Sequence, residues 1–79
     1  MGDVLCDFVE VERDGCTRRM LLDGVIEAAA YRVVRHVTLD VFNVMIDGGS
    51  GVVVIGDELD VSRSEQISVE TFETAIGGW

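Results

Sequence analysis

The amino-acid sequence predicts an α+β domain: a small antiparallel sheet of about four strands in the order ββαββ, with one main helix packed on one face and a short C-terminal helix. An Asp-Gly pair at 14–15 separates two short runs with strand-like alternation, which indicates a hairpin. Apolar residues recur at helical spacing around the alanines at 28–30. β-branched runs at 37–46 and 52–55 flank a glycine-rich turn. The 79 residues correspond to one domain, expected to span residues 1–79.

Residues 3–13 are expected to form the first strand, because their apolar side chains would share one face at a period of two. Residues 16–22 would return as its partner through a type I′ turn at 13–16. This register places Glu10 opposite Arg19, and such opposite charges stabilise a cross-strand pair. The N-terminal part of the chain therefore predicts a β-hairpin.

A helix is expected from about residue 24 to residue 36, with Asp23 as its N-cap. Glu27 would lie in its first turn and three cations in its last, which complements the helix dipole. The cations are Arg32, Arg35 and His36. The predicted buried stripe consists of Ile26, Ala29, Ala30, Val33 and Val37.

Residues 37–46 are apolar on both faces, which predicts a central strand. The glycine-rich turn 47–51 would connect it to a second buried strand at 52–55. Residues 56–66 are polar and are expected to wrap over the surface. The last segment, 67–76, favours a short helix with a serine N-cap and a glycine stop, and an edge strand is the alternative.

The chain carries fifteen carboxylates, six arginines and no lysine, a net charge of −9. Residues 37–79 hold eight of the carboxylates and only one arginine, whereas residues 1–36 hold seven carboxylates and five arginines. The resulting negative field favours basic partners and disfavours nucleic acid and anionic membranes. A GC-rich genome would also explain the absence of lysine, a surface selected for solubility would explain the acidity, and adaptation to high salt would explain both.

Several functions are not expected from this sequence. No apolar run approaches the roughly 18 residues of a membrane span, and the acidic N-terminus lacks the features of a signal peptide, so we expect a cytoplasmic protein. Cys6 and Cys16 would lie apart in the predicted hairpin and are expected to be free thiols. Two cysteines and one histidine are too few for a structural zinc site, and no motif indicates a cofactor.

No catalytic residue is predicted. The glycines at 48–51 lack the lysine of a phosphate-binding loop and follow Asp47, which would repel phosphate. His36 has no serine or cysteine nearby in a recognisable catalytic context. The sequence therefore indicates a binding protein and not an enzyme.

The C-terminal Ile76-Gly77-Gly78-Trp79, taken with the predicted order ββαββ, resembles the ubiquitin-like sulfur carriers. The resemblance covers the topology and two glycines. It implies a flexible tail that enters an activating enzyme. This chain departs from the pattern because Trp79 follows the glycine pair and would have to be removed, and because no strand leads into the glycines.

The carboxylates of the C-terminal half are the main predicted site. An array of this kind can occupy a Lys/Arg groove built for DNA or RNA. Small size, acidity and the lack of a catalytic set make the chain similar in character to anti-CRISPR and anti-restriction proteins encoded by phages and plasmids. The expected partner-binding residues are Asp57, Glu58, Asp60, Glu65, Glu70 and Glu73.

We therefore expect an inhibitor that binds a basic surface of a defence nuclease or ribonucleoprotein. It would act in the host cytoplasm if a phage encodes it. A ubiquitin-like carrier is one alternative. A small phage structural or assembly protein is another, and it leaves open a homodimer.

Overall fold

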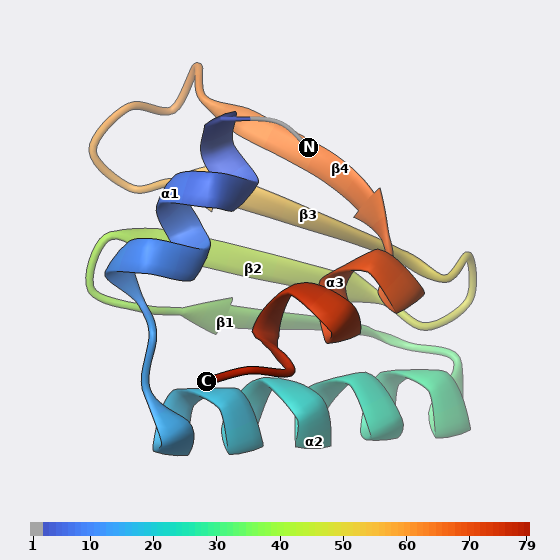
Figure 1. Cartoon of the computed structure of the whole chain (residues 1–79). Helices are drawn as coiled ribbons and strands as arrows, with labels where there is room; N and C mark the ends of the chain where they lie inside the picture. The colour runs from blue at the N-terminus through green and yellow to red at the C-terminus, as the bar shows by residue number, and fades with distance from the viewer. Residues whose placement is uncertain (1–2) are drawn as a thin grey trace.

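The computed structural model describes residues 3–79. Within them, four short strands form one antiparallel sheet in the order β1-β2-β3-β4, accompanied by three helices (Figure 1). The elements are α1 (Asp3–Val11), α2 (Gly15–Tyr31), β1 (Val34–Thr38), β2 (Phe42–Asp47), β3 (Val52–Asp57), β4 (Ser64–Ser68) and α3 (Val69–Ile76). The α+β class and the four-stranded antiparallel sheet agree with the prediction. The element order is ααββββα in place of the expected ββαββ.

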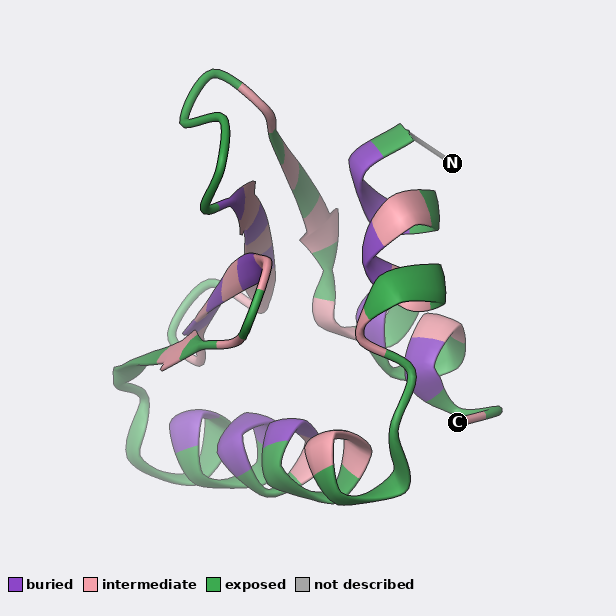
Figure 2. Ribbon diagram, turned by 90° about the vertical axis from the view of Figure 1, so that its left-hand side faces the viewer, coloured by how far each residue is buried: buried purple, intermediate pink, exposed green. Residues whose placement is uncertain are grey.

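The helices lie on one side of the sheet, and no described element covers the other side (Figure 2). Burial alternates along the two central strands, so every second residue of β2 and β3 faces the helices. These side chains pack with the apolar faces of α1, α2 and α3. The largest fully buried residues are Phe8, Phe42, Phe72, Leu5, Leu21, Ile46, Ile55, Ile76, Val44 and Val53.

Helix α1 replaces the first predicted strand. It buries Val4, Leu5 and Phe8, whose spacing of three and four residues is that of a helix face. The alternation that suggested a strand was ambiguous, because Leu5 and Val9 are four residues apart and fit a helix equally well. Burial against the sheet therefore decides the conformation here.

Asp14 begins the second helix and is not part of a hairpin turn. Its side chain accepts the backbone N–H of Thr17 at 2.9 Å, which is the usual bond of a helix N-cap. Residues 16–22 are consequently helical, and the predicted pairing of Glu10 with Arg19 does not occur. An Asp-Gly pair suits both a type I′ turn and a helix start, and the second use was missed.

Helix α2 ends at Tyr31, before the predicted end at 36. Arg32 adopts a left-handed conformation, φ 52° and ψ 47°, and its N–H donates to the carbonyl of Ala28. The predicted buried stripe is also wrong, since Ile26 is 67% exposed. The residues that α2 buries are Leu21, Gly24, Val25 and Ala28.

The predicted strand 37–46 is in fact two strands, β1 and β2. The chain reverses between them, where the N–H of Leu39 donates to the carbonyl of Phe42 at 2.8 Å. This turn has no glycine or proline to mark it in the sequence. As a result, Arg35 and His36 lie on the edge strand β1 and not in the last turn of a helix.

The glycine-rich turn at 47–51 is confirmed. The Oδ1 atom of Asp47 accepts the N–H groups of Gly49 and Ser50 at 2.9 and 3.2 Å. Gly48 is required by packing, because a Cβ at this position would overlap the carbonyl oxygen of Ala28 in α2. The turn therefore fixes α2 against the end of the β2–β3 hairpin.

The helical prediction for the last segment is confirmed for α3. The Ser68 hydroxyl accepts the N–H of Thr71 at 3.1 Å and caps the helix. Phe72 and Ile76 are its buried residues, and the helix ends before Gly77. The preceding segment, expected to be irregular, contributes the end of β3 and the start of β4, so only residues 58–63 form a connection.

The structure also bears on thiol, metal and membrane chemistry. Cys6 and Cys16 are free, as predicted, and both are exposed. Among residues 3–79, no group of three or more His, Cys, Asp or Glu side chains is arranged to hold a metal ion. None of the helices in this part of the chain is long and apolar enough to cross a membrane.

Candidate functional site

The connection between β3 and β4 exposes apolar side chains more fully than any other described segment. Leu59 is 83% exposed and Val61 is 94% exposed, the highest values among the large exposed hydrophobic residues. They alternate with Glu58 and Asp60, which are also exposed. We refer to residues 58–62 as the 58–62 loop.

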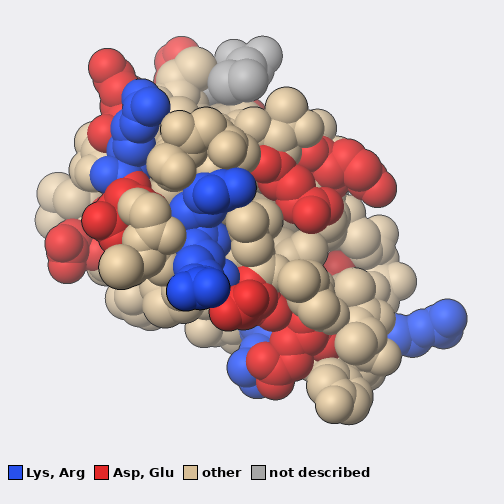
Figure 3. Space-filling model, turned by 60° about the horizontal axis from the view of Figure 1, so that its bottom comes forward, with Lys and Arg blue, Asp and Glu red and all other residues tan. Residues whose placement is uncertain are grey.

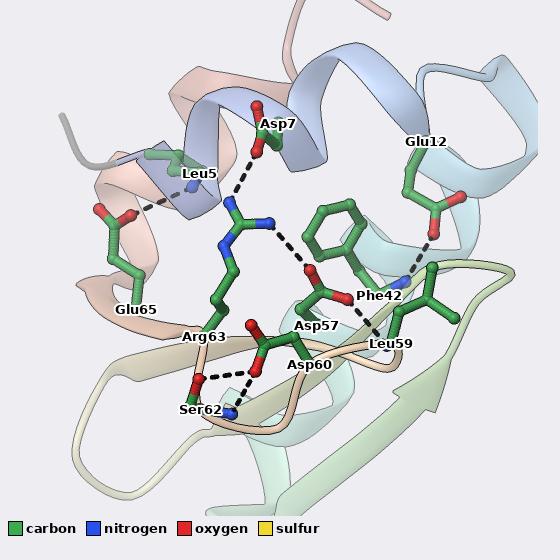
Figure 4. A network of polar contacts seen from close by, with 10 residues as sticks. All are labelled: Leu5, Asp7, Glu12, Phe42, Asp57, Leu59, Asp60, Ser62, Arg63 and Glu65. Carbon is green, nitrogen blue, oxygen red and sulfur yellow. Dashed lines mark hydrogen bonds and ion pairs between the residues drawn. The ribbon is translucent and has the colours of Figure 1, made fainter.

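The base of this loop is closed by a backbone hydrogen bond and by an ion pair, and Figure 4 shows the ion pair. The N–H of Asp57 donates to the carbonyl of Arg63 at 3.0 Å. The Nη1 atom of Arg63 donates to Oδ2 of Asp57 at 2.9 Å. The Asp57 carboxylate is buried, and burying a carboxylate costs free energy unless a charged partner and hydrogen bonds compensate for the lost solvation.

Two carboxylates, one at the base of the loop and one within it, accept hydrogen bonds from residues two positions later in the chain. Asp57 Oδ1 accepts the N–H of Leu59 at 2.8 Å. Asp60 Oδ1 accepts the N–H and the hydroxyl of Ser62 at 3.1 and 2.6 Å. The two bonds from Ser62, with the hydroxyl bond contributing most, lower the pKa of Asp60 below its ordinary value of 3.8. The loop therefore has a defined conformation and an ionised carboxylate.

Arg63 also attaches the loop to α1. Its Nη2 atom lies 2.6 Å from Oδ2 of Asp7, a residue 56 positions away in the chain. The two carboxylates, with the Asp7 hydrogen bond contributing most, raise the pKa of Arg63. One guanidinium therefore bridges the loop base and the helical layer (Figure 4).

Two further carboxylates hold α1 on the sheet. Glu65 Oε1 accepts the N–H of Leu5 at 3.1 Å, in the first turn of α1. At the other end, Glu12 Oε2 accepts the N–H groups of Val41 and Phe42 at 3.2 and 3.1 Å. The loop and α1 consequently belong to one polar network.

The six predicted partner-binding residues do not form one surface. Asp57 is buried, and Glu65 is half-buried and bound to α1, so both support the fold. Glu58 and Asp60 are exposed on the 58–62 loop. The remaining two, Glu70 and Glu73, are exposed on α3, which follows the opposite end of β4.

Charge is segregated differently from the predicted division into two halves. Residues 13–36, which include α2, carry five arginines and three carboxylates, a net charge of +2. The rest of the chain carries twelve carboxylates and one arginine, a net charge of −11. On the α2 side of the molecule, basic and acidic side chains interleave (Figure 3). The strongest negative charge therefore lies outside the α2 region, in the N-terminal helix as well as in the C-terminal half.

A second feature is a groove of about 620 Å³ between α2 and the edge strand β1. Cys16 and Arg19 of α2 line it, and β1 contributes the other wall, although the strand register points the His36 side chain to the opposite face of the sheet. Arg35 also lines the groove and pairs with Glu27 at 2.9 Å. Cys16 is a free, exposed thiol, and among the described residues no hydrogen bond joins it to His36.

The C-terminal residues fold back on the protein. The Trp79 ring packs against Phe8 with centroids 5.4 Å apart. The carbonyl of Gly78 accepts a bond from Nη2 of Arg13 at 3.3 Å, and the N–H of Trp79 donates to Ile76 at 3.2 Å. This geometry differs from the extended tail that the resemblance to sulfur carriers implies.

Comparison of the chain with protein-family models, with curated proteins and with solved structures gives no significant match. The assignment of a site therefore depends on geometry alone. Sequence reasoning identified the acidic residues of the 58–62 loop but missed the exposure of Leu59 and Val61. Their alternation with carboxylates, in a segment otherwise poor in apolar residues, was the available signal.

Proposed function

We propose that the protein acts by stoichiometric binding to a basic protein surface, with the 58–62 loop as the main contact. The observation that carries this proposal is the exposure of Leu59 and Val61 on a loop whose base is fixed by Asp57 and Arg63. Burial of exposed apolar surface is the main favourable contribution in most protein–protein association. A loop with a defined conformation loses less entropy when it binds.

The carboxylates of the loop would select the partner. Glu58 and Asp60 flank the apolar residues, and the pKa of Asp60 is lowered, so its side chain is ionised at neutral pH. The protein carries a net charge of −9, which accelerates association with a cationic surface. The matching partner surface is an apolar pocket bordered by lysine or arginine.

The specific form of this proposal is an inhibitor of a nucleic-acid-binding protein, such as a defence nuclease or ribonucleoprotein. The grooves of such proteins are lined with cations that neutralise phosphates. Glu70 and Glu73 on α3 would act as peripheral contacts that contribute mainly to long-range attraction. The carrier hypothesis lacks comparable support, because Trp79 is packed against Phe8.

The experiment compares two loop variants with a matched control. The first variant combines Leu59→Ser with Val61→Ser, and the second combines Glu58→Lys with Asp60→Lys. The control combines Glu70→Lys with Glu73→Lys, which changes the same charge on α3. Proteins retained by the immobilised wild type are identified by mass spectrometry, and each purified candidate is then titrated by calorimetry.

We expect each loop variant to lose at least ~30-fold in affinity and the α3 control to lose less than ~5-fold at moderate salt. A short DNA duplex should displace this protein from its partner, because the duplex and this protein would occupy the same groove of the partner. The unfolding free energy of the serine variant should stay within ~0.5 kcal/mol of the wild type, since both side chains are exposed. Equal binding by the loop variants, or a partner indifferent to the duplex, would refute the proposal.

A further inference from the structure

The face of the sheet opposite the helices is almost free of charge. Three residues of each strand point to this side, as the alternating burial and the strand register show. Only Asp47 among them carries a formal charge, although Asp, Glu and Arg make up 27% of the chain. Six of the other eleven residues are polar and uncharged, so the face keeps the polarity usual for the water-covered side of an antiparallel sheet and is distinguished by its lack of charge.

Asp47 is the last residue of β2, next to the turn, and does not lie at the centre of this face. Its Oδ1 atom accepts the N–H groups of Gly49 and Ser50. Backbone bonding to Ser50 is the main cause that lowers the pKa of Asp47. The uncharged area therefore extends over the middle of all four strands.

The central row of this face is apolar in the middle and polar at both ends. The register places His36, Met45, Val54 and Gln66 side by side across β1, β2, β3 and β4. Read from either edge, the order is polar, apolar, apolar, polar. A twofold axis in the plane of contact, along the strands or across them, would therefore place apolar on apolar and polar on polar.

We infer that the open sheet face is a dimer interface that packs against the same face of a second copy. Two copies, each with a net charge of −9, repel each other wherever carboxylates meet. The open face is where they can approach without bringing carboxylates together. Charged residues are depleted at the centre of protein interfaces, as they are here.

The size of the face determines the expected strength of this contact. Four five-residue strands cover roughly 300 Å² in plan, from the usual strand spacing and rise. Standard interfaces bury about 800 Å² of accessible surface per partner. The dimer should therefore dissociate on dilution, and higher salt should strengthen it by screening the repulsion between the two copies.

The helices α1 and α3 lie on the opposite side of the sheet (Figure 2). Dimerisation would leave their outer surfaces accessible on both copies. The inference does not depend on the proposed function, because it uses other residues and a different partner.

The test is sedimentation equilibrium of the full chain from about 10 µM to about 1 mM, at low and high salt. The test variant is Val54→Glu, which places a carboxylate at the centre of the face. The matched control is Ile26→Glu, which adds the same charge at an exposed position of α2. We expect a concentration-dependent dimer whose dissociation constant rises at least ~100-fold in Val54→Glu and less than ~3-fold in the control.

If circular dichroism shows that Val54→Glu does not fold, a second variant still tests the inference. Gln66→Glu adds a carboxylate at the exposed end of the central row, and we expect it to weaken the dimer at least ~5-fold. If the protein is monomeric at every concentration, the inference is wrong, even if the face binds a different protein. A dimer insensitive to both variants would overturn it as well, because another surface would then be responsible.

Discussion

The base and the tip of the β3–β4 connection both carry carboxylates, but those at the base are bonded within the fold and those at the tip are exposed to solvent. At the base, the Asp57 carboxylate is buried, bound to Arg63 and bound to the N–H of Leu59. At the tip, Glu58 and Asp60 are exposed, and no described cation forms an ion pair with either of them. The comparison shows that acidity alone does not identify an interaction site, because the partners of each carboxylate decide its role.

The apolar residues show the same contrast between burial in the fold and exposure at the tip of the loop. Those that α1 presents to the sheet, such as Leu5 and Phe8, are fully buried. Leu59 and Val61 are held in solvent by a loop that does not fold back on the core. The network at the base therefore stabilises the fold and at the same time keeps two apolar side chains available at the tip.

The strongest test of this comparison removes the buried carboxylate. In Asp57→Ala, Arg63 loses its buried partner and the N–H of Leu59 loses its acceptor. We expect the free energy of unfolding to fall by about 2–3 kcal/mol, measured by urea denaturation. This estimate is below that of a fully buried pair because the Arg63 side chain is 35% exposed.

Two controls make this prediction specific. Glu58→Ala, at the adjacent position of the tip, should change stability by less than ~0.5 kcal/mol. Asp7→Ala removes the more exposed partner of the same guanidinium and should cost no more than ~1 kcal/mol. If all three variants lose similar amounts, the distinction between base and tip is wrong.

A smaller effect is expected at the far end of α1. Glu12→Ala removes the acceptor of the Val41 and Phe42 N–H groups, and we expect a loss of about 1–2 kcal/mol. The matched control is Glu10→Ala, an exposed residue of the same helix, which should lose less than ~0.5 kcal/mol. Hydrogen exchange of the two amides should accelerate only in the Glu12 variant. Unchanged exchange would show that this carboxylate does not hold α1.

These contacts also show which parts of the fold the sequence could predict. The 47–51 turn and the cap of α3 were predictable because glycines and Ser68 act within a few residues. Residues 3–13 and 16–22 were misassigned as strands, because Leu5 and Val9 fit both periods and Asp14 fits both a turn and an N-cap. Burial against a distant sheet resolves both ambiguities, and this information is not local.

The candidate site was predictable only in its composition. Its acidic residues could be named from the charge count, but the roles of Asp57 and Glu65 depend on contacts with α1. The Glu65 bond to Leu5 joins residues 60 positions apart, and the Arg63 bond to Asp7 joins residues 56 apart. No local pattern in the sequence indicates such pairs.

The smallest predicted effect concerns the conformation of the tip. Folding lowers the pKa of Asp60 below 3.8, so the ionised form is favoured in the folded state. The corresponding stabilisation is present above pH 3.8 and is lost as the pH falls through the folded-state pKa. Ser62→Ala removes the hydroxyl bond to Asp60 and should raise the pKa of Asp60 towards 3.8, as measured by NMR titration of the carboxyl carbons.

The turn carboxylate of Asp47 provides the internal control for this titration. Its pKa is also lowered, but by backbone bonds to Ser50 and Gly49, so Ser62→Ala should leave it unchanged. Asp60 remains ionised at neutral pH in both proteins, and the variant therefore alters the order of the tip without altering its charge. Weaker partner binding by Ser62→Ala at pH 7 would show that the conformation of the loop contributes to recognition. An unchanged pKa of Asp60 would instead show that the hydroxyl bond does not hold the tip.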